Sequence, residues 1–262
     1  MQALRIAARG MAGQQMNVEV ISNHTANMNT VALKRQRAEF QDLLYQNLKR
    51  VGATSSDAGT IIPTGVQVGL GVKTGSVYRI AEQGNLMMTH NNYDIAIQGQ
   101  GYFRVTLPSG ETAYTRSGSF QLSPTGEMVT QEGYQLQPGV VIPQDAVGVS
   151  IDATGQVSVK IAGQVAPTQV GQLDLAIFFN PAGLEAMGDN LFMQSGSSVE
   201  PIPGPPGAAG FGPLLQGYTE ASNVDAVSEI TALIVAQRAY EMNSKVITTA
   251  DEMLQAANQV KS

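Results

Sequence analysis

The residue types that most often carry out chemistry in proteins are sparse in this sequence. Its 262 residues include two histidines, His24 and His90, and no cysteine. Neither histidine lies in an HExxH or His-x-His pattern of the kind that binds zinc. Without cysteine, a disulfide framework is excluded as well. The sequence therefore predicts no metal site and no cofactor.

A glycine-containing stretch, GLGVKTG at 69–75, resembles a phosphate-binding loop only in part. Val72 stands where such a loop needs glycine directly before the lysine, and no strand–helix unit surrounds it. An extended strand of small residues is the better interpretation. The sequence also lacks the Gly-x-Ser-x-Gly elbow of many hydrolases.

Carboxylates are the remaining candidates for catalysis. Those in the middle of the chain are Asp94, Glu111, Glu127, Glu132, Asp145 and Asp152. Two of them could form a glycosidase pair, but they lie mostly in or beside turns, where carboxylates are usually solvated. We therefore expect no enzyme activity and no small-molecule substrate.

The net charge of −6 is unevenly distributed along the chain. Residues 1–50 carry seven Lys or Arg against three Asp or Glu, residues 91–200 carry three against ten, and residues 201–262 three against six. The basic residues are scattered rather than gathered in the dense patch typical of nucleic-acid binding. The asymmetry favours a basic N-terminal segment that pairs with an acidic C-terminal one.

Both ends of the chain carry a seven-residue apolar repeat, which is typical of helices that pack against other helices. The repeat positions are Leu4, Met11 and Val18 near the N-terminus and Leu233, Tyr240, Ile247 and Leu254 near the C-terminus. We expect residues 1–50 and 217–262 to pack as a coiled coil, on each other or on copies in neighbouring chains. The alternative is an ordinary core helix of a single globular domain.

Within the N-terminal segment, Gly10 and Gly13 each weaken an isolated helix by roughly 1 kcal/mol relative to alanine. The polar stretch 22–30 should end this helix, and residues 34–48 then read as a second amphipathic helical piece. The first 20 residues interrupt their apolar positions with Arg5 and Arg9, so they predict no secretory signal peptide.

The remaining chain reads as strands and turns. Residues 51–75 predict an extended arm that contacts other subunits through Ile61, Pro63, Val66 and Val68, followed by a connector at 76–90. Residues 91–198 predict an antiparallel β-rich domain, and the Pro/Gly-rich residues 199–216 a linker without a core. The predicted fold class is α+β, mainly β, with the β-rich domain between two helical ends.

Several motifs resemble those of the bacterial flagellar rod and hook proteins, also called axial proteins. They are SNVDAVSEITALIVAQRAYEMNSKVITTADEMLQAANQ near the C-terminus, DIAIQGQGYFRV, YTRSGSF, PTGEMVT and GYQL in the β-rich domain, and FFNPAGLEAMGDNLFMQSGSS at its end. The segments ALKRQRAEFQDLLYQNLKRVGA and IIPTGVQVGLGV are similar in particular to distal rod members. The resemblance covers nearly the whole chain.

The chain departs from this family at residues 22–33. His24 and Thr25 replace a small-polar/leucine pair, and Ala32 and Leu33 replace Gly-Phe. Because glycine is missing at position 32, we expect the bend after the first helix to be straighter.

The resemblance implies a structural subunit of the distal rod, with an inner coiled-coil layer and an outer layer of β domains. Its implied partners are further copies of itself in a helical homopolymer, proximal rod proteins, hook or hook-base proteins, the surrounding P and L ring proteins and the flagellar type III export apparatus. The rod would cross the periplasm, and its subunits would be exported without a cleaved signal peptide.

Two alternatives stay open at this point. The chain could be another axial protein, of the proximal rod or hook. It could also be a secreted β-module adhesin, which would present aromatic residues on its surface to stack on sugars. The aromatic residues considered for this role are Tyr93, Tyr102, Phe103, Tyr114, Phe120 and Tyr134, and most are expected to point inward.

Overall fold

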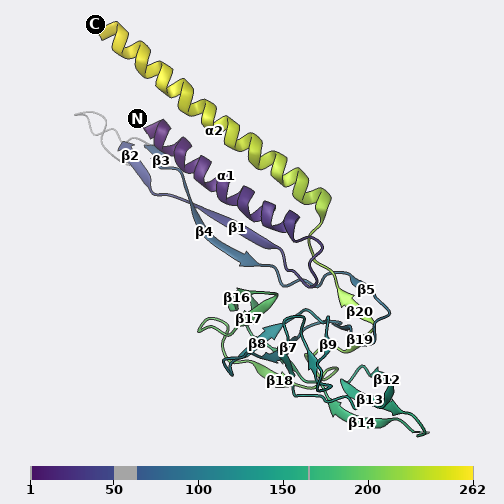
Figure 1. Cartoon of the computed structure of the whole chain (residues 1–262). Helices are drawn as coiled ribbons and strands as arrows, with labels where there is room; N and C mark the ends of the chain where they lie inside the picture. Colours follow the sequence, from purple (N-terminus) through teal and green to yellow (C-terminus); the bar gives the residue numbers. More distant parts are fainter. Residues whose placement is uncertain (1, 50–63, 165, 262) are drawn as a thin grey trace. The chain divides into compact units, whose positions relative to one another are not determined.

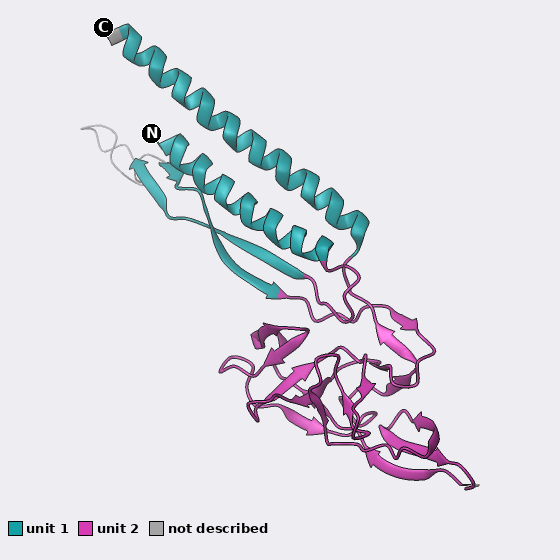
Figure 2. Cartoon of the chain, in the orientation of Figure 1, with its two compact units in different colours: residues 1–26, 36–78, 225–262 teal, residues 27–35, 79–224 magenta. Residues whose placement is uncertain are grey.

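The computed structural model describes residues 2–49, 64–164 and 166–261 of the chain. The chain forms two compact units, coloured separately in Figure 2. Unit 1 comprises residues 1–26, 36–78 and 225–262, and unit 2 comprises residues 27–35 and 79–224. The chain thus has the predicted fold class, α+β, with a β-rich part between an N-terminal and a C-terminal helix.

Unit 1 contains the two helices, α1 (Gln2–Ala26) and α2 (Ala226–Lys261), and a β ribbon. The ribbon strands are β1 (Gln36–Asp42), β2 (Tyr45–Lys49), β3 (Val66–Gly69) and β4 (Val72–Arg79). Strand β1 pairs with β4, and β2 pairs antiparallel with β3. Figure 1 shows α1 lying between α2 and this ribbon.

The second helical piece predicted at 34–48 is wrong, because these residues form β1 and β2. Burial along β1 alternates with the period of two of a strand, with Ala38 and Phe40 more covered than their neighbours. Leu44 and Leu48, which suggested a helical stripe, are 83% and 58% exposed. The apparent helical repeat at 34–48 was therefore misleading, because Leu44 and Leu48 do not belong to one packed face.

Unit 2 is built from short strands. They are β5 (Leu86–Met88), β6 (Ile95–Ile97), β7 (Tyr102–Thr106), β8 (Thr112–Thr115), β9 (Gln121–Leu122), β10 (Met128–Val129), β11 (Gln135–Gln137), β12 (Ala146–Ile151), β13 (Gln156–Ile161), β14 (Thr168–Gln172), β15 (Leu175–Ile177), β16 (Glu185–Gly188), β17 (Leu191–Met193), β18 (Ile202–Gly204), β19 (Leu214–Gln216) and β20 (Tyr218–Glu220). A short 3-10 helix, η1, spans Pro181–Gly183.

The strands of unit 2 pair antiparallel. The main sheet has the order β16-β17-β8-β7-β11-β10-β9, and β15 joins β7 to β18. A second sheet has the order β12-β13-β14, and a turn at residues 152–155 connects its first two strands. The antiparallel pairs β6–β19 and β5–β20 bring residues 86–97 of this unit beside residues 214–220.

The core of unit 2 consists of alternate side chains from these strands. Its largest fully buried members include Phe103, Phe120, Met128, Leu136 and Leu175. The rings of Phe103 and Phe120 meet edge to face, with centroids 5.1 Å apart. Of the aromatic residues considered above, Phe103, Tyr114 and Phe120 are buried and the others half-buried, as expected for inward-pointing positions.

Residues 199–216 are more ordered than the predicted linker. They include β18, which pairs with β15, and β19, which pairs with β6. Phe211 packs against the main core, and Pro206 is buried. The Pro/Gly composition misled the prediction because extended segments rich in these residues can also serve as short edge strands. The predicted connector at 76–90 likewise contains the end of β4 and all of β5.

No helix among the described residues is long and apolar enough to cross a membrane. No group of three or more His, Asp or Glu side chains in the same residues is arranged to hold a metal ion.

Candidate assembly interface

Helices α1 and α2 run antiparallel along one another. Gly10 lies against Asn243, and His24 reaches Glu229, so increasing residue numbers in α1 correspond to decreasing numbers in α2. At 1.5 Å per residue α1 is about 38 Å long and α2 about 54 Å. On this register Gln2 lies level with Asp251, so the last part of α2 extends beyond α1 (Figure 1).

The predicted repeat of α2 lies on its α1-facing side. Leu233, Ile247 and Leu254 are half-buried there, whereas Tyr240 is 39% exposed at the edge. A second set at the same seven-residue spacing completes this face: Glu229, Ala236, Asn243 and Ala250. The sequence analysis missed this second set because its members are small or polar. Taken together, the two sets alternate in steps of four and three residues, as the core positions of a coiled coil do.

The N-terminal repeat residues Leu4, Met11 and Val18 are all half-buried on α1. The fully buried positions of this helix include Ala7, Gly13, Val20 and Ile21, which the seven-residue count did not select. The reason is that α1 packs on two sides rather than one, so its covered surface is wider than a single stripe.

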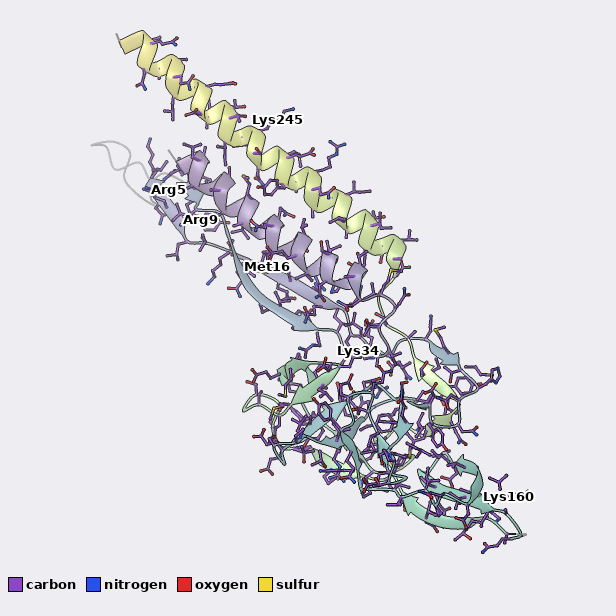
Figure 3. The ribbon with its side chains drawn as sticks, in the orientation of Figure 1. Arg5, Arg9, Met16, Lys34, Lys160 and Lys245 are labelled. Carbon is purple, nitrogen blue, oxygen red and sulfur yellow. The ribbon has the colours of Figure 1, made fainter. Side chains whose placement is uncertain are left out.

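The two glycines of α1 explain how it fits between α2 and the ribbon. A Cβ atom at Gly10 would lie 2.9 Å from Asn243 Oδ1, and one at Gly13 would lie 3.4 Å from the Phe40 ring. Gly10 therefore permits close approach of α2, and Gly13 close approach of β1. On the ribbon side, Arg9 (labelled in Figure 3) donates from Nη1 to the carbonyl oxygen of Leu70 at 2.7 Å.

His24 connects three elements at the end of α1. Its Nδ1 lies 3.0 Å from Glu229 Oε2 on α2, and its Nε2 accepts a hydrogen bond from the backbone N–H of Gln36 at 2.8 Å. Because Nε2 is the acceptor, the proton of the neutral ring is on Nδ1, which donates to the carboxylate. His24 and Glu229 are 3% and 7% exposed. This histidine thus has a structural role.

The side of α2 opposite α1 carries many exposed apolar side chains, interspersed with charged ones such as Arg238 and Glu241, and it is open in the described chain. Its exposed apolar residues are Val227, Ile230, Ile234, Val235, Met242, Val246, Met253 and Val260. Between α1 and α2 runs a groove of about 360 Å³ lined by Val18 and Tyr240 together with Gln15, Glu19, Gln237 and Glu241. Unit 1 therefore presents apolar helical surface on two sides of α2.

The predicted arm is seen only in part. Ile61 and Pro63 lie outside the described residues. Val66 and Val68 are in β3, where Val66 is 46% exposed and Val68 half-buried. The paired strand β2 adds Tyr45 and Leu48, both more than half exposed. The outer part of the ribbon is thus an exposed apolar surface as well.

A buried ionic network organises unit 2. Glu220, at the end of β20, contacts Lys34 Nζ through Oε1 and Arg116 Nε through Oε2, the latter at 2.7 Å. Lys34 also donates to the Glu82 carbonyl oxygen at 2.7 Å, and the Arg116 guanidinium donates to the carbonyl oxygens of Ile97, Gly99 and Gly101. The network joins segments that are far apart in sequence.

The pKa values in this network follow from burial and pairing. Burial acts to raise the pKa of Glu220, but the charges of Arg116 and Lys34 outweigh it and hold that pKa below the ordinary value. Burial lowers the pKa of Lys34, with Glu220 opposing. Elsewhere in unit 2, burial raises the pKa values of Tyr102 and Tyr114 and lowers that of Arg79. None of these groups is joined to a nucleophile or metal.

The bend after α1 is retained despite the missing glycine. Ala32 adopts a φ of 58°, the left-handed conformation that favours glycine, and is 3% exposed. Its N–H donates to the Glu220 carbonyl oxygen at 2.7 Å. The expectation of a straighter segment is therefore wrong, because tertiary contacts impose the bend on alanine.

Comparison with known proteins agrees with this architecture. Residues 96–159 match the model of the flagellar hook protein FlgE/F/G D1 domain, and residues 215–260 match that of the flagellar basal body rod FlgEFG protein C-terminal region. The first match lies in unit 2, and the second contains α2 up to Val260.

Full-length relatives extend the match. The chain is 63% identical to the flagellar basal-body rod protein FlgG of Caulobacter vibrioides over all of both chains. It is 45% identical to FlgG of Borreliella burgdorferi, over 100% of this chain and 99% of that protein, and 38% identical to FlgG of Bacillus subtilis over 97% of each. The chain belongs to the FlgG family of flagellar basal-body rod proteins.

Proposed function

We propose that this protein, a structural subunit of the distal flagellar rod, polymerises into a rigid hollow helical shaft that transmits torque from motor to hook and conducts exported subunits. The observation that carries the proposal is the apolar face of α2 opposite α1. An amphipathic helix on the surface of a monomer normally turns its apolar side inward. Here α2 is apolar on both sides, and the outer one includes Met242, Val246 and Met253, each 46–63% exposed.

A second copy of the helical pair is the natural cover for this face. Helices with two apolar faces pack in layers of more than two, and contacts between unlike faces repeat without closing into a dimer. The groove at Val18 and Tyr240 supplies the second, unlike face. Repetition of such a contact produces a helical polymer.

The ribbon is proposed to add a further contact between subunits. Tyr45, Leu48 and Val66 present exposed apolar side chains on paired strands, which are stiffer than a free loop. Together with Val68, which like Val66 belongs to the predicted inter-subunit arm, they would lie across neighbouring copies and stiffen the shaft. The other two predicted arm residues, Ile61 and Pro63, lie outside the described residues.

The remaining parts of the proposal rest on membership of the family. The protein belongs in the flagellar basal body. There its proposed partners are proximal rod proteins, hook or hook-base proteins and the P and L ring proteins. The rod would cross the periplasm, and its subunits would pass through the type III export apparatus without a cleaved signal peptide.

The decisive experiment is assembly by purified protein, measured by sedimentation and electron microscopy. A variant with Met242→Ser, Val246→Ser and Met253→Ser should keep the circular dichroism of the wild type but form no tubes. The matched control, Thr231→Ser, Thr248→Ser and Thr249→Ser, changes three exposed residues of the same helix and should assemble normally. Tubes from the first variant at the wild-type concentration would refute the proposed role of this face.

A further inference from the structure

Unit 2 has a second candidate contact site, separate from the helices. The lining of a pocket of about 200 Å³ includes two cationic residues, Lys34 and Arg116, and three aromatic residues, Tyr102, Phe178 and Phe179. All of these residues belong to unit 2. The pocket is therefore cationic at its base and aromatic at its wall.

The positive charge at the base is only partly balanced. The side chains of Lys34 and Arg116 are 5% and 6% exposed and share a single carboxylate, that of Glu220. Arg79 adds a third positive charge nearby, since its guanidinium lies 4.8 Å from the centre of the Phe192 ring, which contacts Tyr102. Opposite charges are favoured strongly where water is excluded, so the pocket is suited to an additional carboxylate.

The aromatic wall suggests that the ligand belongs to a macromolecule. Phe178 is buried against Tyr102 and Tyr114, with ring centroids 5.8 Å and 4.8 Å away, and it forms a fixed surface. The next residue, Phe179, is 90% exposed at the rim. A large aromatic side chain held in water beside a pocket is a common feature of protein contact sites.

The charge of the chain identifies the partner. Residues 91–200 carry three Lys or Arg against ten Asp or Glu, and Arg116 of the pocket is one of the three. Unit 2 as a whole, residues 27–35 and 79–224, carries six Lys or Arg against twelve Asp or Glu, so its net charge is negative. Its exposed acidic residues are Glu82, Glu111, Glu132, Asp145, Asp152, Glu185, Asp189 and Glu200.

We infer that the pocket binds an acidic surface segment of unit 2 from a second copy of this chain, with the incoming carboxylate directed at Lys34 and Arg116 and Phe179 covering the contact. This inference rests on the proposed polymer and adds a lateral contact between β-rich units to the helical one.

The test is a photo-crosslink in assembled tubes. Phe179→p-benzoyl-phenylalanine places the probe at the rim of the pocket, and Val147→p-benzoyl-phenylalanine places it at a matched exposed position on β12, where Val147 is 71% exposed. The probe at 179 should give crosslinked dimers in which the modified peptide of the second copy contains one of the exposed acidic residues. The dimer yield should be at least fivefold above that at 147.

Other outcomes would overturn the inference. They are equal yields at 179 and 147, crosslinks confined to peptides of α1 or α2, and no dimer at 179 in tubes that do form. A third probe, Met242→p-benzoyl-phenylalanine, separates this failure from failure of the proposed function. Crosslinks at 242 without those at 179 reject only the pocket contact, whereas an absence of tubes from wild-type protein rejects both.

Discussion

The imidazole of His24 and the carboxylate of Glu229 form a buried contact across 205 residues of sequence, with Nδ1 and Oε2 3.0 Å apart. The same ring accepts the Gln36 N–H, so one side chain holds α1, α2 and the start of β1 together. No other ionisable side chain is buried in the described part of unit 1.

Replacing His24 with alanine should destabilise unit 1 by about 2–4 kcal/mol, because it leaves a buried carboxylate and a backbone N–H unpaired. Chemical denaturation followed by far-ultraviolet circular dichroism measures the loss. The double variant His24→Leu/Glu229→Leu removes both partners and should recover more than half of it. If the alanine variant lost less than about 0.5 kcal/mol of unfolding free energy, the contact would not contribute to the stability of unit 1 as predicted.

Acid should destabilise unit 2 through Glu220. The folded state holds the pKa of this carboxyl below its ordinary value, so the stabilisation is present above the unfolded pKa of about 4.3 and is lost as pH falls through the folded pKa. Urea unfolding at pH 7, 5, 4 and 3, followed by tyrosine fluorescence, should show the stability falling below pH 5.

Glu220→Gln provides the control for that pH dependence. The variant should lose about 3–5 kcal/mol at pH 7, because two buried cations lose their carboxylate. It should also show a shallower decline in stability between pH 5 and 3 than the wild type. If the two proteins declined in parallel, other carboxylates would be responsible for the acid sensitivity.

Ala32→Gly should be neutral or stabilise the protein by up to about 1 kcal/mol. Glycine relieves the left-handed conformation at this position, while the loss of a buried methyl group costs about 0.8 kcal/mol. The comparison is Ala96→Gly in β6, which is 2% exposed and has no positive φ. That change should cost about 1–2 kcal/mol. Equal losses at both positions would contradict the argument from backbone conformation.

Gly118→Ala should disrupt unit 2. A Cβ atom at this position would lie 1.7 Å from the Ile95 carbonyl oxygen, so the backbone must move, at a cost of about 3 kcal/mol or more. Gly148→Ala is the control, because a Cβ atom there meets no atom within 4 Å among the described residues. Thermal unfolding should separate the two variants by several degrees, and a Gly118→Ala protein with the wild-type melting temperature would refute the prediction.

The parts of the fold that were predictable are those in which local pattern and tertiary packing agree. On α2, the apolar residues Leu233, Ile247 and Leu254 recur in the sequence at seven-residue multiples and are half-buried in the structure. The repeat therefore identified the α1-facing side of this helix. The placement of Asp152 at a turn was predictable, because its carboxylate accepts hydrogen bonds from the N–H groups of Thr154 and Gln156, a local preference that needs no other segment.

The parts that were missed depend on contacts distant in sequence. Residues 36–42 and 45–49 become strands only because β4 and β3 lie beside them and α1 covers Phe40. The buried roles of His24, Lys34 and Glu220 could not be predicted, since their ionic partners lie 104 or more residues away. From the sequence, Gly10 and Gly13 were expected only to weaken α1. In the structure, α2 and β1 occupy the space that a side chain at these positions would fill.

The insertion of unit 2 between the two halves of unit 1 also fixes an order of events. Residues 79–224 are contiguous and can fold while the C-terminus is still being made, whereas α1 has only the ribbon on one side of it until residues 226–261 exist. Contacts that close over such long separations form late. The helical pair can therefore open while unit 2 stays folded. Maturation of this protein consequently ends with its two helices meeting, and the surface proposed to contact other copies is the last to be completed.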